Sequence, residues 1–328
     1  MNINQSLISK KDSTLLKGIL ILLIILGHNS ILMQERGIFN YLYHFHVYVF
    51  LLLPFLYNVP EFTPERMKKD FIHIYKPYTI MFIVVLMINI FALNGKVNVT
   101  GVIYSFLSGN EQMIKKNIGA SFLWFMPTMF SLLLLRNWLM KQPAKILWSC
   151  VFVSFLAFLV TRVFWFCTVY DFPYIILGGT VSFVYFFMAV SSRYVYEKYH
   201  GKRFFDITSC TLFILTTIIS FACSNGYLYN IITWGILPVS ALYTFVAIAK
   251  LLKKDNTFTK CINWLGKESL PIYLFHVIIY NAILLIIQKI QLAENILTGI
   301  ISYVVTIVIT TILIYLCKKS KIYNIIFN

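Results

Sequence analysis

Charged residues are scarce in this chain, and acidic residues are the scarcest. Only 12% of the 328 residues are charged, and only 12 residues are Asp or Glu. A chain so poor in charge cannot fold around one water-soluble core. All acidic residues fall in polar loops or at the ends of apolar runs. Because ion-coupled transporters place carboxylates inside their membrane spans, this distribution argues against that class.

Cysteine motifs are also missing. The six cysteines are scattered, with no Cys-x-x-Cys pair and no Cys/His ligand spacing. The sequence therefore predicts neither a disulfide framework nor a metal site. We expect no bound cofactor.

Hydrophobic residues make up 59% of the chain and form long runs between short polar loops. This pattern predicts an all-α, polytopic integral membrane protein. We expect one membrane domain over residues 1–328, with a polar segment at 1–13, a ten-helix bundle at 14–317 and a tail at 318–328. The predicted spans are 14–33, 41–58, 74–94, 119–140, 146–163, 173–191, 206–224, 228–252, 270–288 and 296–317.

The net charge of +16 follows from this topology. Most of the 28 lysine and arginine residues fall on the side of the N-terminus, and only six fall on the other side: Arg36, Lys96, Lys115, Lys116, Arg162 and Lys289. By the positive-inside rule, both termini are predicted to be cytoplasmic. The basic charge therefore needs no nucleic-acid partner.

The first apolar run, KGILILLIILGH, opens on Lys17 and closes on His28. Eleven helical positions place the two side chains on one face, ~16 Å apart along the axis. An imidazole inside a spanning helix is by default a functional candidate. The alternative is that His28 only forms a hydrogen bond with a neighbouring helix.

Other histidines lie near membrane depth. His46 is expected near the depth of His28, on the opposite arm of the first hairpin, whereas His44 fits the aromatic outer interface. His276 lies ~9 Å into the ninth span by helix rise, so we expect it nearer the cytoplasm than His28. A helix-packing hydrogen bond is the simpler interpretation of His276.

Two loop regions are candidate binding sites. The inner loop at 61–76 carries Arg66, Lys68, Lys69 and Lys76, which could bind a polyphosphate or simply face lipid headgroups. On the outer side, Trp124 and Arg162 lie near aromatic residues on which a sugar ring could rest. The structural alternative for Trp124 is an interfacial anchor beside a proline kink.

Five segments in order along the chain carry a family resemblance. They are Lys17 and His28 with ten residues between them, YHFHVYVFLLLPFLY, IYKPY, LWFMPTMF and LGKESLPIYLFHV. Together they resemble acyltransferase family 3, the membrane O-acyltransferases of envelope polysaccharides. The chain is similar to the short, stand-alone form of that family.

The resemblance implies transfer of an acyl group, most simply acetyl, from cytoplasmic acetyl-CoA to a hydroxyl of a cell-envelope or capsular glycan or its lipid-linked precursor. It also implies that the protein is located in the bacterial cytoplasmic membrane. His28 would accept the hydroxyl proton or carry the acyl group, with His46 and His276 in support. Acyl-CoA phosphates would contact Lys17, Arg66, Lys68, Lys69 and Lys76, and the acceptor would contact Trp124 and Arg162 from outside.

Two rival functions belong to other classes. One is a polysaccharide export protein or flippase without acyl transfer. The other is a structural partner in a polysaccharide-synthesis complex, and a homo-oligomer is compatible with each function. An exporter would keep its activity when His28 becomes Ala, whereas an acyltransferase would lose acyl transfer.

Overall fold

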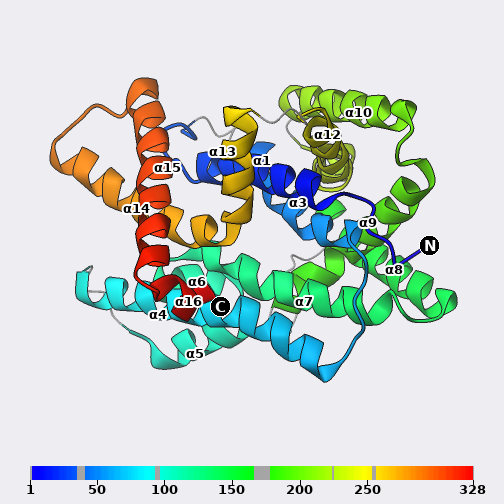
Figure 1. Cartoon of the computed structure of the whole chain (residues 1–328), viewed down its shortest axis with the longest axis horizontal. Helices are drawn as coiled ribbons and strands as arrows, with labels where there is room; N and C mark the ends of the chain where they lie inside the picture. The colour runs from blue at the N-terminus through cyan, green and yellow to red at the C-terminus, as the bar shows by residue number, and fades with distance from the viewer. Residues whose placement is uncertain are drawn as a thin grey trace. The chain divides into compact units, whose positions relative to one another are not determined.

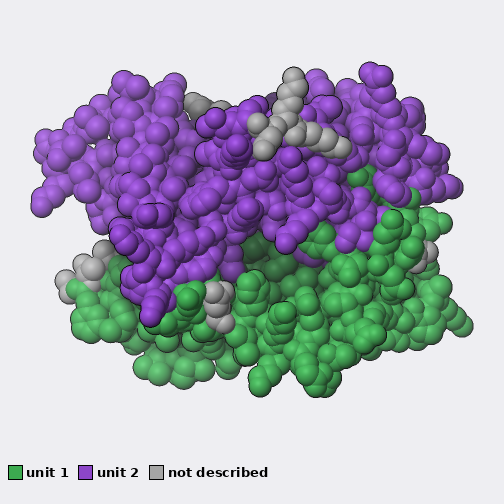
Figure 2. All heavy atoms as spheres, in the orientation of Figure 1, with its two compact units in different colours: residues 1–5, 57–197, 324–328 green, residues 6–56, 198–323 purple. Residues whose placement is uncertain are grey.

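A computed structural model describes residues 2–34, 41–92, 97–165, 178–223, 225–252 and 256–327. The chain forms two compact units, coloured separately in Figure 2. Unit 1 holds residues 1–5, 57–197 and 324–328, and unit 2 holds residues 6–56 and 198–323. The described residues form helices and no strands, as the predicted all-α class requires.

Unit 1 is built around the long helix α4, which packs against α7. Its elements are α4 (Pro64–Ala92), α5 (Val99–Ser108), α6 (Glu111–Ile118), the 3-10 turn η2 (Ser121–Trp124), α7 (Phe125–Leu139), α8 (Ala144–Phe158), the π-helical η3 (Leu159–Val163) and α9 (Gly179–Tyr199), whose last residues enter unit 2. Asn98 and Asn110 cap the amino ends of α5 and α6 through their side chains.

Unit 2 is built around α1, which contacts α3, α12, α13 and α14. Its elements are α1 (Lys10–Gly27), α3 (His46–Leu52), the 3-10 turn η1 (Leu53–Leu56), α10 (Arg203–Ala222), α11 (Tyr227–Ile231), the π-helical η5 (Ile232–Ile236), α12 (Leu237–Leu251), α13 (Thr257–Lys267), α14 (Ser269–Lys289) and α15 (Ile296–Lys319). The last helix, α16 (Ile322–Phe327), is shared between the two units. Figure 1 labels most of these helices.

Seven helical segments in the described ranges are long and apolar enough to cross a membrane. They are Pro64–Phe91, Ser121–Leu139, Ala144–Val163, Arg203–Ala222, Tyr227–Leu251, Ser269–Lys289 and Ile296–Lys319. Each coincides with a predicted span, so the chain is a multi-pass membrane protein. The helices at the predicted spans 14–33, 41–58 and 173–191 are not among these seven: α1 carries four charged residues, the helical segment Tyr41–Leu56 is shorter, and α9 is long enough but less apolar. The count of ten and the cytoplasmic termini stay predictions.

Two predicted boundaries were wrong. The first helix starts earlier, because the Ser9 side chain caps it by accepting the Asp12 amide at 3.0 Å, and it ends at Gly27 rather than continuing to 33. The predicted loop at 61–76 is helical from Pro64 onward, with Pro77 inside the helix. A proline suits a first helical turn, and Pro64 supplies that start.

Helices α1 and α13 cross in close backbone contact, a feature that the sequence analysis did not predict. A Cβ on Gly266 would collide with the Thr14 carbonyl, and one on Gly18 would collide with the Ile262 carbonyl. Two glycines therefore allow the helix backbones to touch. Asn256 and Thr259 form a reciprocal capping box that starts α13.

Glu268 joins α14 to the end of α15 and the start of α16. This buried carboxylate accepts hydrogen bonds from Lys318 at 2.5 Å and from the Tyr323 hydroxyl at 2.9 Å. Burial, together with the hydrogen bond to this carboxylate, raises the pKa of Tyr323 above its ordinary value. The contact fixes the amino end of α14, the helix that carries His276.

Some residues used in the topology argument lie outside the described ranges. They are Arg36 and Lys96, which were both placed on the outer side.

Candidate active site

His28 lies where α1 ends, and its ring meets aromatic side chains from two other segments of unit 2. The His28 and His276 ring centroids are 5.1 Å apart. The Tyr43 hydroxyl lies 3.3 Å from His28 Nδ1, within hydrogen-bond distance. His28 is partly exposed, whereas His276 is fully buried. Of the two residues in ring contact, His28 is therefore the less buried.

His46 belongs to the same group. Its ring centroid is 4.9 Å from that of Tyr43, which also contacts His28. His46 Nε2 would lie 3.2 Å from a Cβ placed on Gly27, so the glycine leaves room for the imidazole beside α1. His46 is fully buried, and its Nε2 has no hydrogen-bond partner among the residues that the structure describes.

His46 and His276 share one hydrogen-bonding pattern. Nδ1 of His46 contacts the Leu42 carbonyl, and Nδ1 of His276 lies 2.8 Å from the Tyr273 carbonyl and 3.1 Å from that of Ile272. Because a carbonyl only accepts, each Nδ1 is assigned the proton, and Nε2 of the neutral ring is left as an acceptor. Two oriented, proton-accepting nitrogens are thus built into the group around His28.

The ring centroids of His28 and His276 are 5.1 Å apart, so any difference in their membrane depth is smaller than the separation expected from the sequence, and its direction stays a prediction. The two expected depths were derived from the helix rise along each span, on the assumption that the spans are parallel. Figure 1 shows α1 running at a steep angle to α15, its neighbour within unit 2. Helix rise along α1 therefore does not report the same direction as rise along α15.

The residues after His28 anchor the end of α1. The Asn29 amide donates to the Gly299 carbonyl and to Ser302 Oγ, each at 3.0 Å. The Ser30 hydroxyl is 2.8 Å from the Tyr280 hydroxyl. These bonds hold the position of His28 against α14 and α15. They also occupy the two polar side chains next to it, so neither is assigned as an oxyanion donor.

His44 lies among aromatic side chains, and its place at the outer interface stays a prediction. It is buried, and its ring meets Trp234 at 4.4 Å and Tyr229 at 6.0 Å. Trp234 lies in the π-helical η5, a local geometry that often marks functional segments. His44 therefore packs in an aromatic cluster of unit 2.

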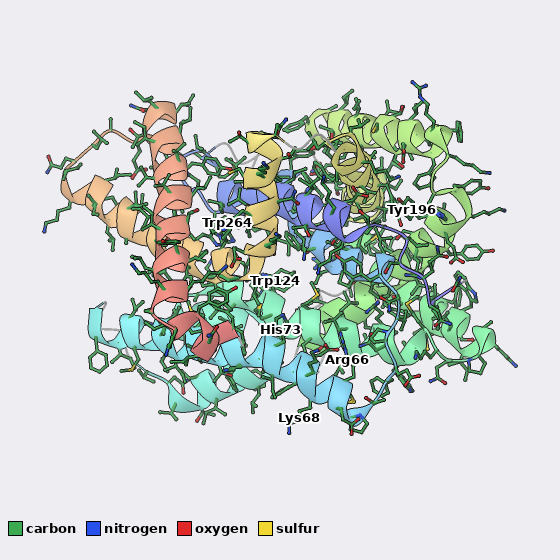
Figure 3. The ribbon with its side chains drawn as sticks, viewed as in Figure 1. Arg66, Lys68, His73, Trp124, Tyr196 and Trp264 are labelled. Atoms are coloured by element: carbon green, nitrogen blue, oxygen red, sulfur yellow. The ribbon has the colours of Figure 1, made fainter. Side chains whose placement is uncertain are left out.

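The predicted cationic patch surrounds a cavity in unit 1. The cavity measures about 490 Å³ and is lined by Glu65, Lys68, Lys69, Ile72, His73, Lys76 and Phe327. Most of these residues lie on the first turns of α4, where Figure 3 labels Lys68 and His73. The helix brings three of the predicted lysines to one concave surface, which suits an anionic ligand.

Arg66 and Lys17 lie elsewhere. Arg66 pairs with Asp70 through two contacts of 3.0 Å and does not line the cavity. Asp70 also accepts from Asn137, so the arginine is held in a polar network. Lys17 lies mid-way along α1 in unit 2 and is partly buried. The five predicted phosphate contacts are therefore divided between the two units.

The two predicted acceptor contacts both lie in unit 1. Trp124 ends η2 and is partly exposed, in edge contact with Phe125 at 6.2 Å. Arg162 lies in the π-helical η3 and is 9% exposed, with its guanidinium 5.8 Å from the Tyr185 ring centroid. Arg162 is thus a buried cation over an aromatic ring rather than a loop residue.

Sequence reasoning missed Tyr43 and Tyr280. Both contact the segment around His28, yet each resembles the interfacial tyrosines that gather at membrane surfaces. The spacing of Tyr43 three residues before His46 was the available signal, since it places both rings on one helical face.

Comparison with protein families identifies the class. The model of the acyltransferase domain of family 3 matches residues 11–318, nearly the whole chain. The protein therefore belongs to acyltransferase family 3 and is a membrane acyltransferase. The matched range includes both His28 and His276. Searches of curated proteins and of solved structures gave no match.

Proposed function

We propose that this protein is an acyl-CoA-dependent O-acyltransferase of the bacterial cell membrane, which transfers acetyl to a hydroxyl of an envelope glycan. The observation that carries the proposal is the cluster of three histidines: His28 is partly exposed, its ring contacts that of His276, and His46 lies beside Gly27 and Tyr43. Clustered imidazoles at membrane depth have no simple packing role, because each brings polar atoms that must be satisfied there.

In the reaction, the sugar oxygen attacks the thioester carbonyl while His28 accepts the hydroxyl proton. The C–O ester bond forms, the C–S bond breaks, and the CoA thiolate leaves and takes up the proton. The Tyr43 hydroxyl at Nδ1 holds the His28 ring in one orientation. His46 and His276 keep their Nε2 atoms as acceptors, and their Nδ1 contacts with backbone carbonyls hold both rings in place beside the catalytic group.

The donor's phosphates are assigned to the basic cavity of α4. Lys68, Lys69 and Lys76 supply ammonium groups, and a charge-assisted hydrogen bond to phosphate is worth about 1.5–3 kcal/mol. Lys17 is a further cationic contact in unit 2. Arg66, already paired with Asp70, contributes by fixing the first turns of α4.

The acceptor is assigned to Trp124 and Arg162. The Trp124 indole offers an aromatic face to a sugar ring, and the Arg162 guanidinium offers hydrogen-bond donors to hydroxyls. A capsular polysaccharide and its lipid-linked precursor both carry such hydroxyls.

A strain carrying His28→Ala tests the function. Mass analysis of its envelope glycan is expected to show loss of the acetyl increments, while the variant protein is still found in the membrane fraction. Export of unmodified glycan should continue at the normal level. Glycan that keeps its acetyl groups while export continues would contradict acyl transfer and favour the export function.

The basic cavity is tested separately. Lys69→Ala combined with Lys76→Ala is expected to raise KM for acetyl-CoA by about 10-fold or more, because two phosphate contacts are lost. Lys115→Ala with Lys116→Ala, on α6 of the same unit, is the matched control and should leave KM unchanged. An equal rise in both variants would show a general charge effect and refute the assignment.

A further inference from the structure

A second cavity lies just beyond His28, on the outer side of the predicted topology. It measures about 520 Å³ and is lined by Ile31, Leu32, Gln34, Asn295, Ile296 and Leu297. We name it the outer groove. All of its residues belong to unit 2, as do the three clustered histidines. Its first residue follows His28 by three positions.

The outer groove is apolar within and polar at one end. Four of its lining residues are aliphatic, and Gln34 and Asn295 are amides. The Gln34 amide donates to the Glu294 carboxylate at 3.4 Å. Asn295 Oδ1 caps α15 by accepting from the Thr298 amide at 3.0 Å. The groove therefore offers the Asn295 amide nitrogen as a donor and the Gln34 carbonyl oxygen as an acceptor to a hydroxyl. Among the described residues, which stop at Gln34 on this side, the groove lining includes no cation, so a phosphate headgroup has no ionic partner among them.

The groove opens on a helix face that is suited to hydrocarbon. Ile296 is 75% exposed and Leu297 66% exposed, and the exposed apolar row continues along α15 through Ile300 and Val304. Of the candidate spans, α15 has the highest mean hydropathy, 2.5. A hydrocarbon chain could therefore enter the groove sideways from the bilayer without crossing water.

The end of α1 is packed to keep this space open. A Cβ on Gly299 would lie 2.6 Å from Leu32 Cδ2 and 2.8 Å from Leu32 Cγ. Glycine at this position lets Leu32 lie against α15 instead of across the groove. Asn29, the residue after His28, donates a hydrogen bond to the carbonyl of the same Gly299 on α15. This hydrogen bond thus connects the segment that carries both His28 and one wall of the groove to α15.

We propose that the outer groove binds the hydrocarbon chain of a glycolipid, which brings its sugar hydroxyl to His28. The proposal rests on the proposed function and deepens it, because it makes the acceptor a lipid-linked sugar rather than a finished polysaccharide. The apolar walls hold the chain, and the amide end faces the hydroxyl-rich head. A membrane phospholipid, whose head carries phosphate, is the competing occupant.

Photolabelling of the purified full chain in lipid nanodiscs tests the occupant. Two probes carry the same diazirine-bearing alkyl chain, one with a glucoside head and one with a phosphocholine head. The glucoside probe is expected to label the peptides that contain 31–34 and 295–297 at least five times more strongly. Equal labelling, or stronger labelling by the phosphocholine probe, would overturn the proposal.

A pair of variants places the label in the groove. Leu297→Trp fills the space and should reduce glucoside labelling at least five-fold. Val304→Trp, on the exposed row of the same helix but away from the groove, should leave it unchanged. If Leu297→Trp labels like the wild type, the groove is not the site. His28→Ala should label normally, so failure of acyl transfer and failure of the groove are separate results.

Discussion

Hydrogen bonds to the backbone and to the ring of His28 both fix its position. Its amide donates to the Ile24 carbonyl at 3.1 Å, the last regular turn of α1, and its Nδ1 meets the Tyr43 hydroxyl at 3.3 Å. The next residue, Asn29, is buried and bonded to α15. A partly exposed imidazole is therefore held by fixed neighbours on both sides, which is the arrangement that proton transfer in a catalytic site requires.

Tyr43→Phe tests the hydrogen bond at His28 Nδ1. The ring contacts remain, but the hydroxyl that orients the imidazole is removed. We expect kcat to fall by about 10-fold, equivalent to ~1.4 kcal/mol, with KM for acetyl-CoA unchanged. Steady-state acyl transfer by the purified protein measures both constants.

The matched control for this variant is Tyr41→Phe. Its hydroxyl is bonded to Thr217 at 2.8 Å and does not contact the histidines. Its kcat should stay within two-fold of the wild type. If Tyr41→Phe and Tyr43→Phe lower kcat by the same factor, the Tyr43 hydroxyl has no specific role in orienting His28.

At the scale of elements, unit 2 depends on the crossing of α1 and α13. Gly18 and Gly266 bring the two backbones together, and no side chain can rotate away to relieve a collision there. Helix α1 in turn carries His28 at its end. The packing of α13 therefore supports the catalytic group without contacting it.

Gly266→Ala is expected to destabilise the protein at this crossing. Overpacking typically costs about 1–3 kcal/mol, and a collision with a backbone carbonyl belongs at the upper end of that range. A lower melting temperature in detergent, with loss of acyl transfer, is the expected result. Lys260→Ala, at an exposed position of the same helix, should melt like the wild type. Unchanged melting of Gly266→Ala would contradict the close crossing.

At the scale of the whole molecule, the predicted topology places two exposed cysteines on opposite sides. Cys223 follows α10 and Cys261 lies in α13. With the N-terminus cytoplasmic, Cys223 faces outward and Cys261 inward. A membrane-impermeant maleimide should label a Cys223-only variant in intact cells. A Cys261-only variant should react only after permeabilisation, and the reverse pattern would refute the orientation.

Hydropathy alone predicted the seven long apolar helices, because a bilayer-length run of apolar side chains leaves few other structures open. It did not predict α13. This helix is amphipathic, with Ile262 and Leu265 buried and Lys260 exposed, and its charges made it resemble a basic loop. The capping residues Asn256 and Thr259 were the local signal for its start.

The candidate site was only partly predictable. Each of His28, His46 and His276 could be selected singly, since a histidine within an apolar run is costly. Their contact depends on how α1, α3 and α14 cross, which no local pattern encodes. The contact of Tyr43 depends on the same crossings, and the outer groove depends on how the residues after α1 meet the start of α15. Of the predicted cationic residues of α4, Lys68, Lys69 and Lys76 line one cavity, whereas Arg66 pairs with Asp70 and does not line it; their contact with phosphate stays a prediction.

The most direct test of the account is acyl transfer by purified wild type and His28→Ala, with acetyl-CoA and a sugar acceptor. The account predicts that kcat falls by about 10²–10⁴-fold, the usual contribution of a general base, while binding of acetyl-CoA is unchanged. If the His28→Ala protein, correctly folded and inserted, transfers acetyl within two-fold of the wild-type rate, the central role of His28 is contradicted.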